Sequence, residues 1–253
     1  QIEGMGGGIG TQAYTDNGSL AQNVNDCGTL NTTSAVYTLI NNVTSNSTCF
    51  TIAADNITFD GAGYAINYSA NGTLGYGVNG IGYNFSTIKN TVIIEGVNTT
   101  GLKYGIYTRG VSNWTIANNT ITTSGATGYG IYLDTSSNNT VSNNTITTSG
   151  IINCYGIFLV TTKYNTVINN TITTSGTASG YGIYLVAAVS NIISNNIITT
   201  TGNNTGYGIQ LQLTTSANNT ISNNIITTTG NNNGYGIFLN VAGLNNTIRD
   251  NRI

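Results

Sequence analysis

The stretch that decides the fold runs from Tyr129-Gly-Ile-Tyr-Leu133 through Asn139-Thr-Val-Ser-Asn-Asn-Thr-Ile146 to Thr147-Thr-Ser-Gly150. The following segment repeats it in the same order, as Tyr155-Gly-Ile-Phe-Leu159, Asn165-Thr-Val-Ile-Asn-Asn-Thr-Ile172 and Thr173-Thr-Ser-Gly176. Self-similarity at a fixed period is the signature of a repeat architecture. We therefore expect one continuous repeating body rather than several unrelated domains.

The Tyr-Gly-Ile triplet marks the period of the repeat. Its tyrosines recur 25 to 28 residues apart, at Tyr104, Tyr129, Tyr155, Tyr181, Tyr207 and Tyr235, and a Tyr-Gly-Val match begins at Tyr76. The units are rich in Ile, Val, Thr and Tyr and alternate over short runs, which is typical of strands rather than helices. Three short strands fit in each unit, with Asn-Asn and Ser-Gly pairs as corners. The sequence predicts an all-β solenoid, a single parallel β-helix of about eight coils of about 26 residues.

Alternation within each strand predicts which side chains fill the core. Ile131 and Leu133 are expected to point inward, while Gly130 and Tyr132 point the other way. Val141 is expected to line another face of the same core, and the copies of these residues in later units extend both rows. The chain contains no Pro, which agrees with uninterrupted ladders of stacked strands.

A column of asparagines is expected at one corner, from the second Asn of each Asn-Asn pair. Its members are Asn119, Asn144, Asn170, Asn196, Asn224 and Asn251. Asn tolerates the left-handed backbone that a sharp corner needs, and its amide can bond to the copies above and below. We interpret this column as structural, and the alignment places Asp60 and Glu95 in it further upstream.

The repeated Asn-Asn-Thr-Ile and Tyr-Gly-Ile-Tyr-Leu units resemble the right-handed parallel β-helix repeat superfamily, including its NosD-like branch. The segment from Cys27-Gly-Thr-Leu to Phe59-Asp-Gly61 resembles the opening of archaeal surface glycoproteins of that kind. The resemblance covers residues 27–253 and implies a right-handed β-helix there, preceded by a Gly-rich arm or irregular first coil over residues 1–26. It is a poor guide to activity, because one fold hosts many functions.

Composition excludes several functions. Only 6% of residues are charged, His is absent and the net charge is −2, so the chain has too few cations to bind nucleic acid. No apolar run is long enough to span a bilayer. The chain lacks the histidines, and has few of the lysines, on which most acid–base and nucleophilic catalysis depends. We therefore expect no enzyme activity and no cofactor.

Enzymatic members of the resembled superfamily, such as pectin lyases and polygalacturonases, imply acidic and basic residues clustered on adjacent coils. Here the charged residues are scattered, and Asp60 with Glu95 is the best candidate pair. Two carboxylates on consecutive coils could serve in retaining glycoside hydrolysis or bind calcium. We favour the simpler interpretation that both replace Asn at corners, and we name no catalytic or metal-binding residue.

Asn-x-Ser/Thr motifs are numerous and predict N-glycosylation in a secreted protein. Glycans would also hydrate a surface that carries few charges. The candidate acceptors are Asn17, Asn31, Asn42, Asn46, Asn56, Asn67, Asn71, Asn84, Asn98, Asn113, Asn118, Asn138, Asn143, Asn169, Asn203, Asn218 and Asn245.

The chain has three cysteines. Cys27 and Cys49 lie about one coil apart, and a disulfide between them would stabilise an irregular first coil and indicate an oxidising compartment. The alternative is two separate core thiols. Cys154 is left over, either as a free corner thiol or as an intermolecular link.

Two outward stripes are candidate contact surfaces. One carries an aromatic residue in most coils, Tyr107, Tyr132, Phe158, Tyr184 and Phe238, which could meet protein or stack on sugars unless a loop or glycans cover it. The other carries Thr-x-Thr pairs, such as Thr120/Thr122 and Thr145/Thr147, and is similar to the flat arrays of β-helical ice-binding proteins. Strand propensity alone explains these threonines.

The ends of the sequence suggest assembly. Residues 245–253 stop within a coil with no capping segment, and residues 1–14 form a Gly-rich arm without helical periodicity. Open sheet edges are templates for further strands, and head-to-tail contacts generate filaments. We expect an extracellular or cell-surface structural subunit that polymerises with copies of itself. The alternatives are a carbohydrate-binding adhesin or degenerate polysaccharide enzyme and, more remotely, an ice-binding protein.

Overall fold

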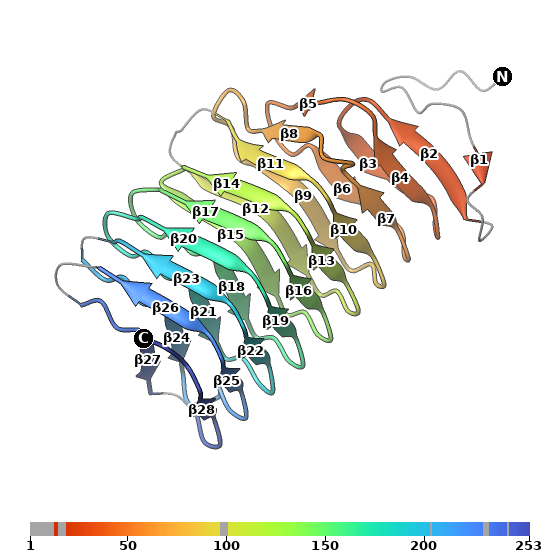
Figure 1. Ribbon diagram of the computed structural model, residues 1–253. Helices are drawn as coiled ribbons and strands as arrows, with labels where there is room; N and C mark the ends of the chain where they lie inside the picture. Colours follow the sequence, from red (N-terminus) through yellow and green to blue (C-terminus); the bar gives the residue numbers. More distant parts are fainter. Residues whose placement is uncertain (1–12, 15–18, 97–100, 203, 230–232, 242) are drawn as a thin grey trace.

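The computed structural model describes residues 13–14, 19–96, 101–202, 204–229, 233–241 and 243–253, which form a solenoid of three sheets (Figure 1). The expected fold is confirmed, with about eight coils and one short strand per sheet in most coils. Over the described ranges the regular elements are all strands. We find there no helix with the length and apolar character needed to cross a membrane.

Sheet A has eleven strands, and all but the first pairing are parallel. Strand β1 (Ala13–Tyr14) is antiparallel to β2 (Leu20–Val24), so part of the predicted N-terminal arm already belongs to the solenoid. Residues 1–12 and 15–18 of that arm lie outside the described residues. The remaining strands are β4 (Val36–Leu39), β7 (Thr58–Asp60), β10 (Thr87–Lys89), β13 (Thr115–Ala117), β16 (Thr140–Ser142), β19 (Thr166–Ile168), β22 (Ile192–Ser194), β25 (Thr220–Ser222) and β28 (Thr247–Arg249).

Sheets B and C complete each coil. Sheet B has nine strands, namely β3 (Gly28–Leu30), β6 (Phe50–Ile52), β9 (Gly75–Ile81), β12 (Leu102–Arg109), β15 (Thr127–Asp134), β18 (Ile157–Val160), β21 (Ile183–Val186), β24 (Ile209–Gln212) and β27 (Ile237–Asn240). Sheet C has eight, namely β5 (Val43–Thr44), β8 (Ala65–Tyr68), β11 (Val92–Glu95), β14 (Thr120–Thr123), β17 (Thr145–Thr148), β20 (Thr171–Thr174), β23 (Ile197–Thr200) and β26 (Ile225–Thr228).

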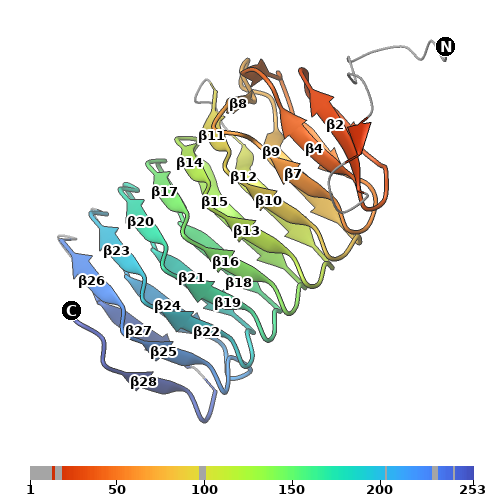
Figure 2. The ribbon, with the colours of Figure 1, turned by 45° about the vertical axis from the view of Figure 1, so that its right-hand side comes forward.

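Each coil passes from sheet B to sheet A, then to sheet C, and returns to sheet B in the next coil (Figure 2). We call the three bends the BA, AC and CB corners. Strands pair with their own copies in neighbouring coils, as in Thr140 with Thr166 and Ile146 with Ile172. This register stacks equivalent side chains in columns along the axis, about 4.8 Å apart.

The interior is an aliphatic column where the repeat is regular. Ile131, Leu133 and Val141 are fully buried, as are their copies in the next three coils, which confirms the predicted core. The copies in the final coil, Leu239 and Ile248, are 46% and 40% exposed. Upstream of the regular repeat, the interior contains large aromatic side chains among the aliphatic ones, including Tyr37, Phe50, Phe59, Tyr68 and Trp114.

The glycine of Tyr-Gly-Ile faces the interior, which corrects the expectation that Gly130 points outward. A Cβ on Gly130 would lie 2.3 Å from Cγ2 of Ile146 in sheet C and 2.6 Å from the carbonyl oxygen of Gly156. Two consecutive residues, Gly130 and Ile131, therefore lie on the inner side. The alternation is interrupted there, and the tyrosine before the glycine moves to the outside.

The predicted asparagine column is confirmed as a hydrogen-bonded ladder at the AC corner. The amide of Asn144 makes all four hydrogen bonds open to it. Its Nδ2 donates to Oδ1 of Asn170 and to the carbonyl of Ile116, at 3.0 and 2.9 Å. Its Oδ1 accepts from both the backbone N–H and Nδ2 of Asn119, each at 3.0 Å. The same pattern continues to Asn251.

The left-handed residue at this corner is not the ladder asparagine but the residue before it. Asn118, Asn143 and Asn169 have φ of 57°, 55° and 57°, and each is exposed. Asn119 and its copies are buried instead. Because the left-handed residue reverses the chain direction, it points outward while its neighbour points inward. The two asparagines of each pair thus have separate roles.

A second ladder, which the sequence analysis missed, runs along the BA corner. It consists of Asn139, Asn165, Asn191, Asn219 and Asn246, joined by Nδ2–Oδ1 hydrogen bonds of 2.9 to 3.1 Å. The backbone N–H of Trp114 donates to its first member, Asn139, at 2.8 Å. Each regular coil is therefore fixed to the next by two buried side-chain amides.

We expect Asn144→Asp to destabilise the protein by at least about 3 kcal/mol, because a carboxylate cannot donate to Asn170 or Ile116 and is buried beside two acceptors. Asn143→Asp is the matched control, since that position is exposed and Asp tolerates the left-handed backbone. Urea unfolding of both unglycosylated variants measures the difference. Equal stabilities would show that the ladder contributes little.

Candidate functional site

The structure separates the two carboxylates that formed the best catalytic candidate. Asp60 ends β7 in sheet A and pairs in register with Lys89, whereas Glu95 ends β11 in sheet C and pairs with Tyr68. The ladder position that we had assigned to Glu95 is occupied by Thr91, whose N–H donates to Oδ1 of Asn119 at 3.1 Å. The assignment was wrong because the coils in this region have different lengths from the regular repeat.

Asp60 takes part in an ordinary surface ion pair. Its Oδ2 lies 3.2 Å from Nζ of Lys89, and both side chains are partly exposed. The pKa of Asp60 is lowered overall: burial opposes the charged form, but hydrogen bonds from Ala62 and Asn90 and the charge of Lys89 outweigh it. Such a carboxylate stays ionised at neutral pH. Across the described ranges, no three His, Cys, Asp or Glu side chains come together in a way that could hold a metal ion.

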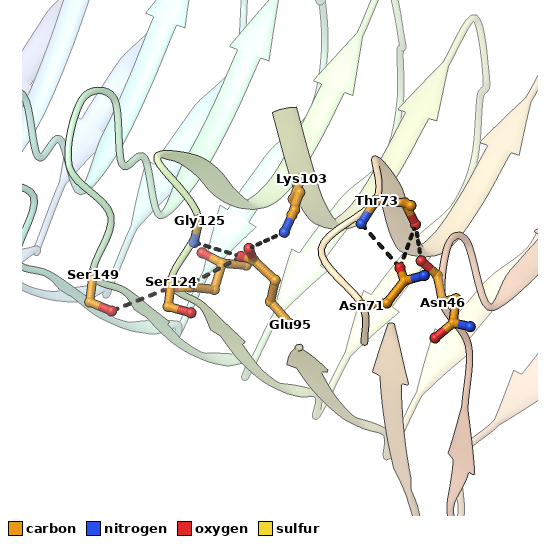
Figure 3. Close-up of polar contacts among 9 residues, drawn as sticks. Asn46, Asn71, Thr73, Glu95, Lys103, Ser124, Gly125 and Ser149 are labelled. Atoms are coloured by element: carbon orange, nitrogen blue, oxygen red, sulfur yellow. Dashed lines mark hydrogen bonds and ion pairs between the residues drawn. The ribbon is translucent and has the colours of Figure 1, made fainter. Parts of the chain in front are cut away.

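Glu95 is instead part of a buried charged cluster at the CB corner (Figure 3). Its Oε1 lies 3.5 Å from Nζ of Lys103, and neither side chain is accessible to solvent. Its Oε2 accepts two backbone hydrogen bonds of 2.9 Å, from the N–H groups of Ser124 and Gly125 in the next coil. Sequence reasoning missed this pair because Lys103 lies in a column where other coils have Gly.

The predicted aromatic stripe on sheet B packs against a second, more buried aromatic column. This inner tyrosine column consists of Tyr76, Tyr104, Tyr129, Tyr155, Tyr181, Tyr207 and Tyr235, with successive ring centroids 4.8 to 5.6 Å apart. Its central members pack with the stripe in a cluster separate from the core. These tyrosines face outward because Gly130 and its copies interrupt the alternation of the strand.

The rings of the two columns cover one another's faces. Within the stripe, Phe158 stacks on Tyr132 and on Tyr184 with centroids 4.9 Å apart. Across the columns, Tyr129 meets the ring of Phe158 edge-on at 5.2 Å. The surface therefore presents ring edges and hydroxyls, and a stacked sugar would find few open faces. A sugar-stacking or protein-contact role for the stripe stays a prediction.

The phenols of Tyr132 and Tyr184 are neutral at physiological pH. Burial raises the pKa of Tyr132 to about 12, and the neighbouring carboxylate of Asp134 adds to the shift. Burial likewise raises the pKa of Tyr184 to about 12. The coil between Tyr184 and Phe238 carries Gln210, which is buried, so the stripe is interrupted there.

An open hollow lies beside the stripe at the BA corner. It has a volume of about 420 Å³ and is lined by Thr135, Ser136, Ser137, Thr161, Thr162, Lys163, Ala187 and Val189. The Thr162 hydroxyl is buried and has no hydrogen-bond partner in the described part of the chain. Hydroxyls and one ammonium group thus surround a space of the size that a small polar ligand needs.

The candidate glycosylation sites lie on the outside. Asn17, Asn98 and Asn203 fall outside the described residues, and Asn67 and Asn84 are half-buried. The other acceptors are exposed, namely Asn31, Asn42, Asn46, Asn56, Asn71, Asn113, Asn118, Asn138, Asn143, Asn169, Asn218 and Asn245. Both ladders are built from asparagines that are not acceptors. At the CB corner, Thr73 bonds to the side chain of Asn71 and to the backbone of Asn46 (Figure 3).

The predicted disulfide is confirmed. Cys27 and Cys49 are bonded, with Cα atoms 4.6 Å apart, and Cys49 is buried in the core. Cys154 is a buried free thiol, and burial raises its pKa to about 11, so it stays protonated and unreactive. Its burial leaves no surface for an intermolecular bond in the folded state.

The threonine array lies on the outer face of sheet C. Thr120 aligns with Thr145 and Thr171, and Thr122 with Thr147 and Thr173. Ile197 and Ile225 continue the first column and are 48% and 42% exposed, so the first hydroxyl row ends there. The second row continues through Thr199 and Thr227. Ice binding stays a prediction.

Some solved structures have a similar fold. The Dettilon tailspike protein matches with a TM-score of 0.46 at 12% identity, over 87% of this chain and 61% of its own. The tailspike of Acinetobacter baumannii bacteriophage Fri1, a capsular polysaccharide depolymerase, has a TM-score of 0.48 at 13% identity, with coverages of 92% and 52%. The A-module of an Azotobacter vinelandii mannuronan C-5 epimerase has a TM-score of 0.39 at 14% identity, over 92% and 88%. At these values the likenesses carry no information on activity.

The sequence itself gives the stronger assignment. No curated protein matches the chain. The family model described as the right-handed β-helix region matches residues 22–198 and 104–253, which together cover both the irregular and the regular coils. The chain therefore belongs to the right-handed β-helix family.

Proposed function

We propose that the protein is a non-enzymatic structural subunit of an extracellular filament or surface layer and that it carries N-glycans. The observation that carries the proposal is the division of the corner asparagines. Asn139 and Asn144 are buried and hold the coils together, while Asn138 and Asn143 point outward within acceptor motifs. The same corners thus stiffen the rod and offer sites for glycans.

The surface chemistry supports this proposal. The chain has only six cationic and eight anionic side chains. Much of the exposed charge is neutralised in three of the described ion pairs, Asp60–Lys89, Arg109–Asp134 and Arg249–Asp250. A large uncharged surface lacks the hydration and repulsion that keep proteins apart. Glycans along the corners would supply both.

An extracellular location is also a proposal, and the disulfide supports it. Disulfides such as Cys27–Cys49 persist in oxidising compartments and are rare in the cytosol. The resemblance of residues 27–61 to archaeal surface glycoproteins points the same way. Assembly by stacking coil on coil is the mode that the architecture offers, because parallel sheets extend by adding strands.

We expect glycopeptide mass spectrometry of the secreted protein to find glycans on the exposed corner asparagines, including Asn138. Thr140→Val removes the acceptor motif of Asn138 but keeps a strand-forming residue, and it should abolish modification at that site alone. Thr140→Ser, which retains the hydroxyl, is the matched control. Unmodified asparagine at every exposed motif would contradict the glycoprotein part of the proposal.

We expect negative-stain electron microscopy of the purified protein to show unbranched fibres or ordered arrays whose abundance increases with protein concentration. Enzymatic or chemical removal of the glycans separates the roles of protein and sugar, and we expect the assemblies to persist without glycan. If only separate monomers are seen at all concentrations, with and without glycans, the structural function is wrong.

A carbohydrate-binding adhesin is the second candidate, and the hollow near Lys163 is the observation that favours it. Hydroxyls of Thr135, Ser137 and Thr161 could replace water around a sugar, and Lys163 would favour a negatively charged one. Glycan-array binding that Lys163→Ala weakens at least about tenfold, while Arg249→Ala leaves it unchanged, would support this candidate. Absence of binding to acidic and neutral glycans would exclude it.

A further inference from the structure

The buried pair at the CB corner differs from every equivalent position in the regular coils. The column that contains Glu95 continues as Thr123, Thr148, Thr174 and Thr200, and the column of Lys103 contains Gly75 and Gly128. One coil thus replaces a neutral threonine and glycine with a carboxylate and an amine. Both side chains are fully buried, where isolated charges are expensive.

The surroundings hold the carboxyl group of Glu95 in one orientation. Its Oε2 accepts hydrogen bonds from the N–H groups of Ser124 and Gly125, and its Oε1 faces Nζ of Lys103, 3.5 Å away. A Cβ on Gly125 would lie 2.4 Å from Oε1, so only glycine allows this approach. Within the described part of the chain, Oε1 has no hydrogen-bond partner besides this ionic contact.

We propose that Lys103 and Glu95 condense to form an intramolecular amide cross-link, a modification site within the fold. The ammonium and the carboxylate together lose one water molecule and become a neutral secondary amide. The net reaction needs no oxidant, nucleotide or metal, since the atoms of the pair supply both products. It also removes two buried charges, which favours the product in an apolar interior.

The geometry provides each step. A proton passes from Nζ to Oε1 and leaves a neutral amine beside a neutral carboxylic acid. The nitrogen then attacks the carboxyl carbon, and the electron pair of the C=O bond moves to Oε2. The two N–H groups at 2.9 Å from Oε2 stabilise that negative charge as an oxyanion hole does. When the C=O bond reforms, Oε1 takes the second proton released by the nitrogen and leaves as water.

Tyr68 is the buried tyrosine next to Glu95 in sheet C. It precedes Glu95 in the same column of sheet C, it is fully buried, and its hydroxyl has no hydrogen-bond partner among the described residues. Burial, together with the negative charge of Glu95, raises the pKa of Tyr68 well above its usual value. The hydroxyl therefore stays protonated and adds no negative charge beside the pair.

The chain contains a natural control for this chemistry. Lys89 and Asp60 lie closer together, with Nζ 3.2 Å from Oδ2, but their side chains are 38% and 22% exposed. Water stabilises both charges there, and among the described residues a single backbone N–H group, that of Ala62, donates to the carboxylate. We expect this pair to remain ionic. Proximity alone would cross-link both pairs, whereas burial with an oxyanion hole selects Lys103 and Glu95.

The cross-link would tie β11 to β12 across the CB corner, where the irregular coils meet the regular ones. The disulfide Cys27–Cys49 makes a comparable covalent tie nearer the N-terminus. The inference does not depend on the proposed structural function, because it rests on the contacts of one corner.

The test is the intact mass of the unglycosylated full chain after reduction, alkylation and denaturation. We expect the mass to fall below the sequence mass by one water, and proteolysis to give one branched peptide that joins the Lys103 and Glu95 segments. High mass resolution separates this loss from the ammonia lost when Gln1 cyclises. A linear Lys103 peptide with a free ε-amine in the folded wild-type protein would overturn the proposal.

Variants assign the roles. Lys103→Met and Glu95→Met should each restore the full mass, because neither variant can form the amide. Lys89→Met, at the exposed pair, should leave the loss of water unchanged. Circular dichroism of each variant confirms folding, and the mass of the wild-type protein decides the question even if one of them does not fold. Loss of water that persists in Lys103→Met would place the modification elsewhere.

Discussion

The side-chain amide of asparagine is the interaction on which the rest of this structure depends. A carboxamide has two donor hydrogens and an oxygen that accepts two hydrogen bonds, and the spacing of stacked coils lets each amide bond to the next copy and to the backbone. Asn144 makes all four of these bonds while buried. Two such ladders fix the BA and AC bends of every regular coil, and the strands of sheets A and C that adjoin them are only three or four residues long.

The ladders also determine the surface. A buried ladder residue requires a left-handed residue before it, and that residue, such as Asn143, must point outward. At the AC corners of the regular coils before the last one, these outward residues are uncharged asparagines, and Asn118, Asn143 and Asn169 lie in acceptor motifs. Between the corners, the outer face of sheet B carries two columns of aromatic rings that pack against each other, and the outer face of sheet C carries rows of threonines. We take these surfaces as support for the proposed glycosylated structural subunit.

The regular coils contrast with the CB corner around Glu95. The regular corners use neutral groups whose hydrogen bonds are complete, whereas this corner buries a carboxylate and an amine. Other coils have threonine and glycine at these two positions, so the fold does not require an ion pair there. A buried ion pair also adds little net stability, because the cost of desolvating both charges offsets most of their attraction. The proposed amide cross-link would explain why a charged pair is buried at the junction between the irregular and the regular coils.

The sequence by itself determined the fold class, the period, the aliphatic core, the AC ladder and the disulfide, because each depends on residues that recur in register or on a spacing of about one coil. Tertiary structure alone decided the outward position of Tyr129 and its copies, since Gly130 interrupts the alternation only through its contact with Ile146 in another sheet. It alone separated Asp60 from Glu95 and joined Glu95 to Lys103, because coils of unequal length shift the register in a way that no periodic alignment can follow. Local repetition specifies which strands stack, whereas contacts between sheets decide where the exceptional side chains meet.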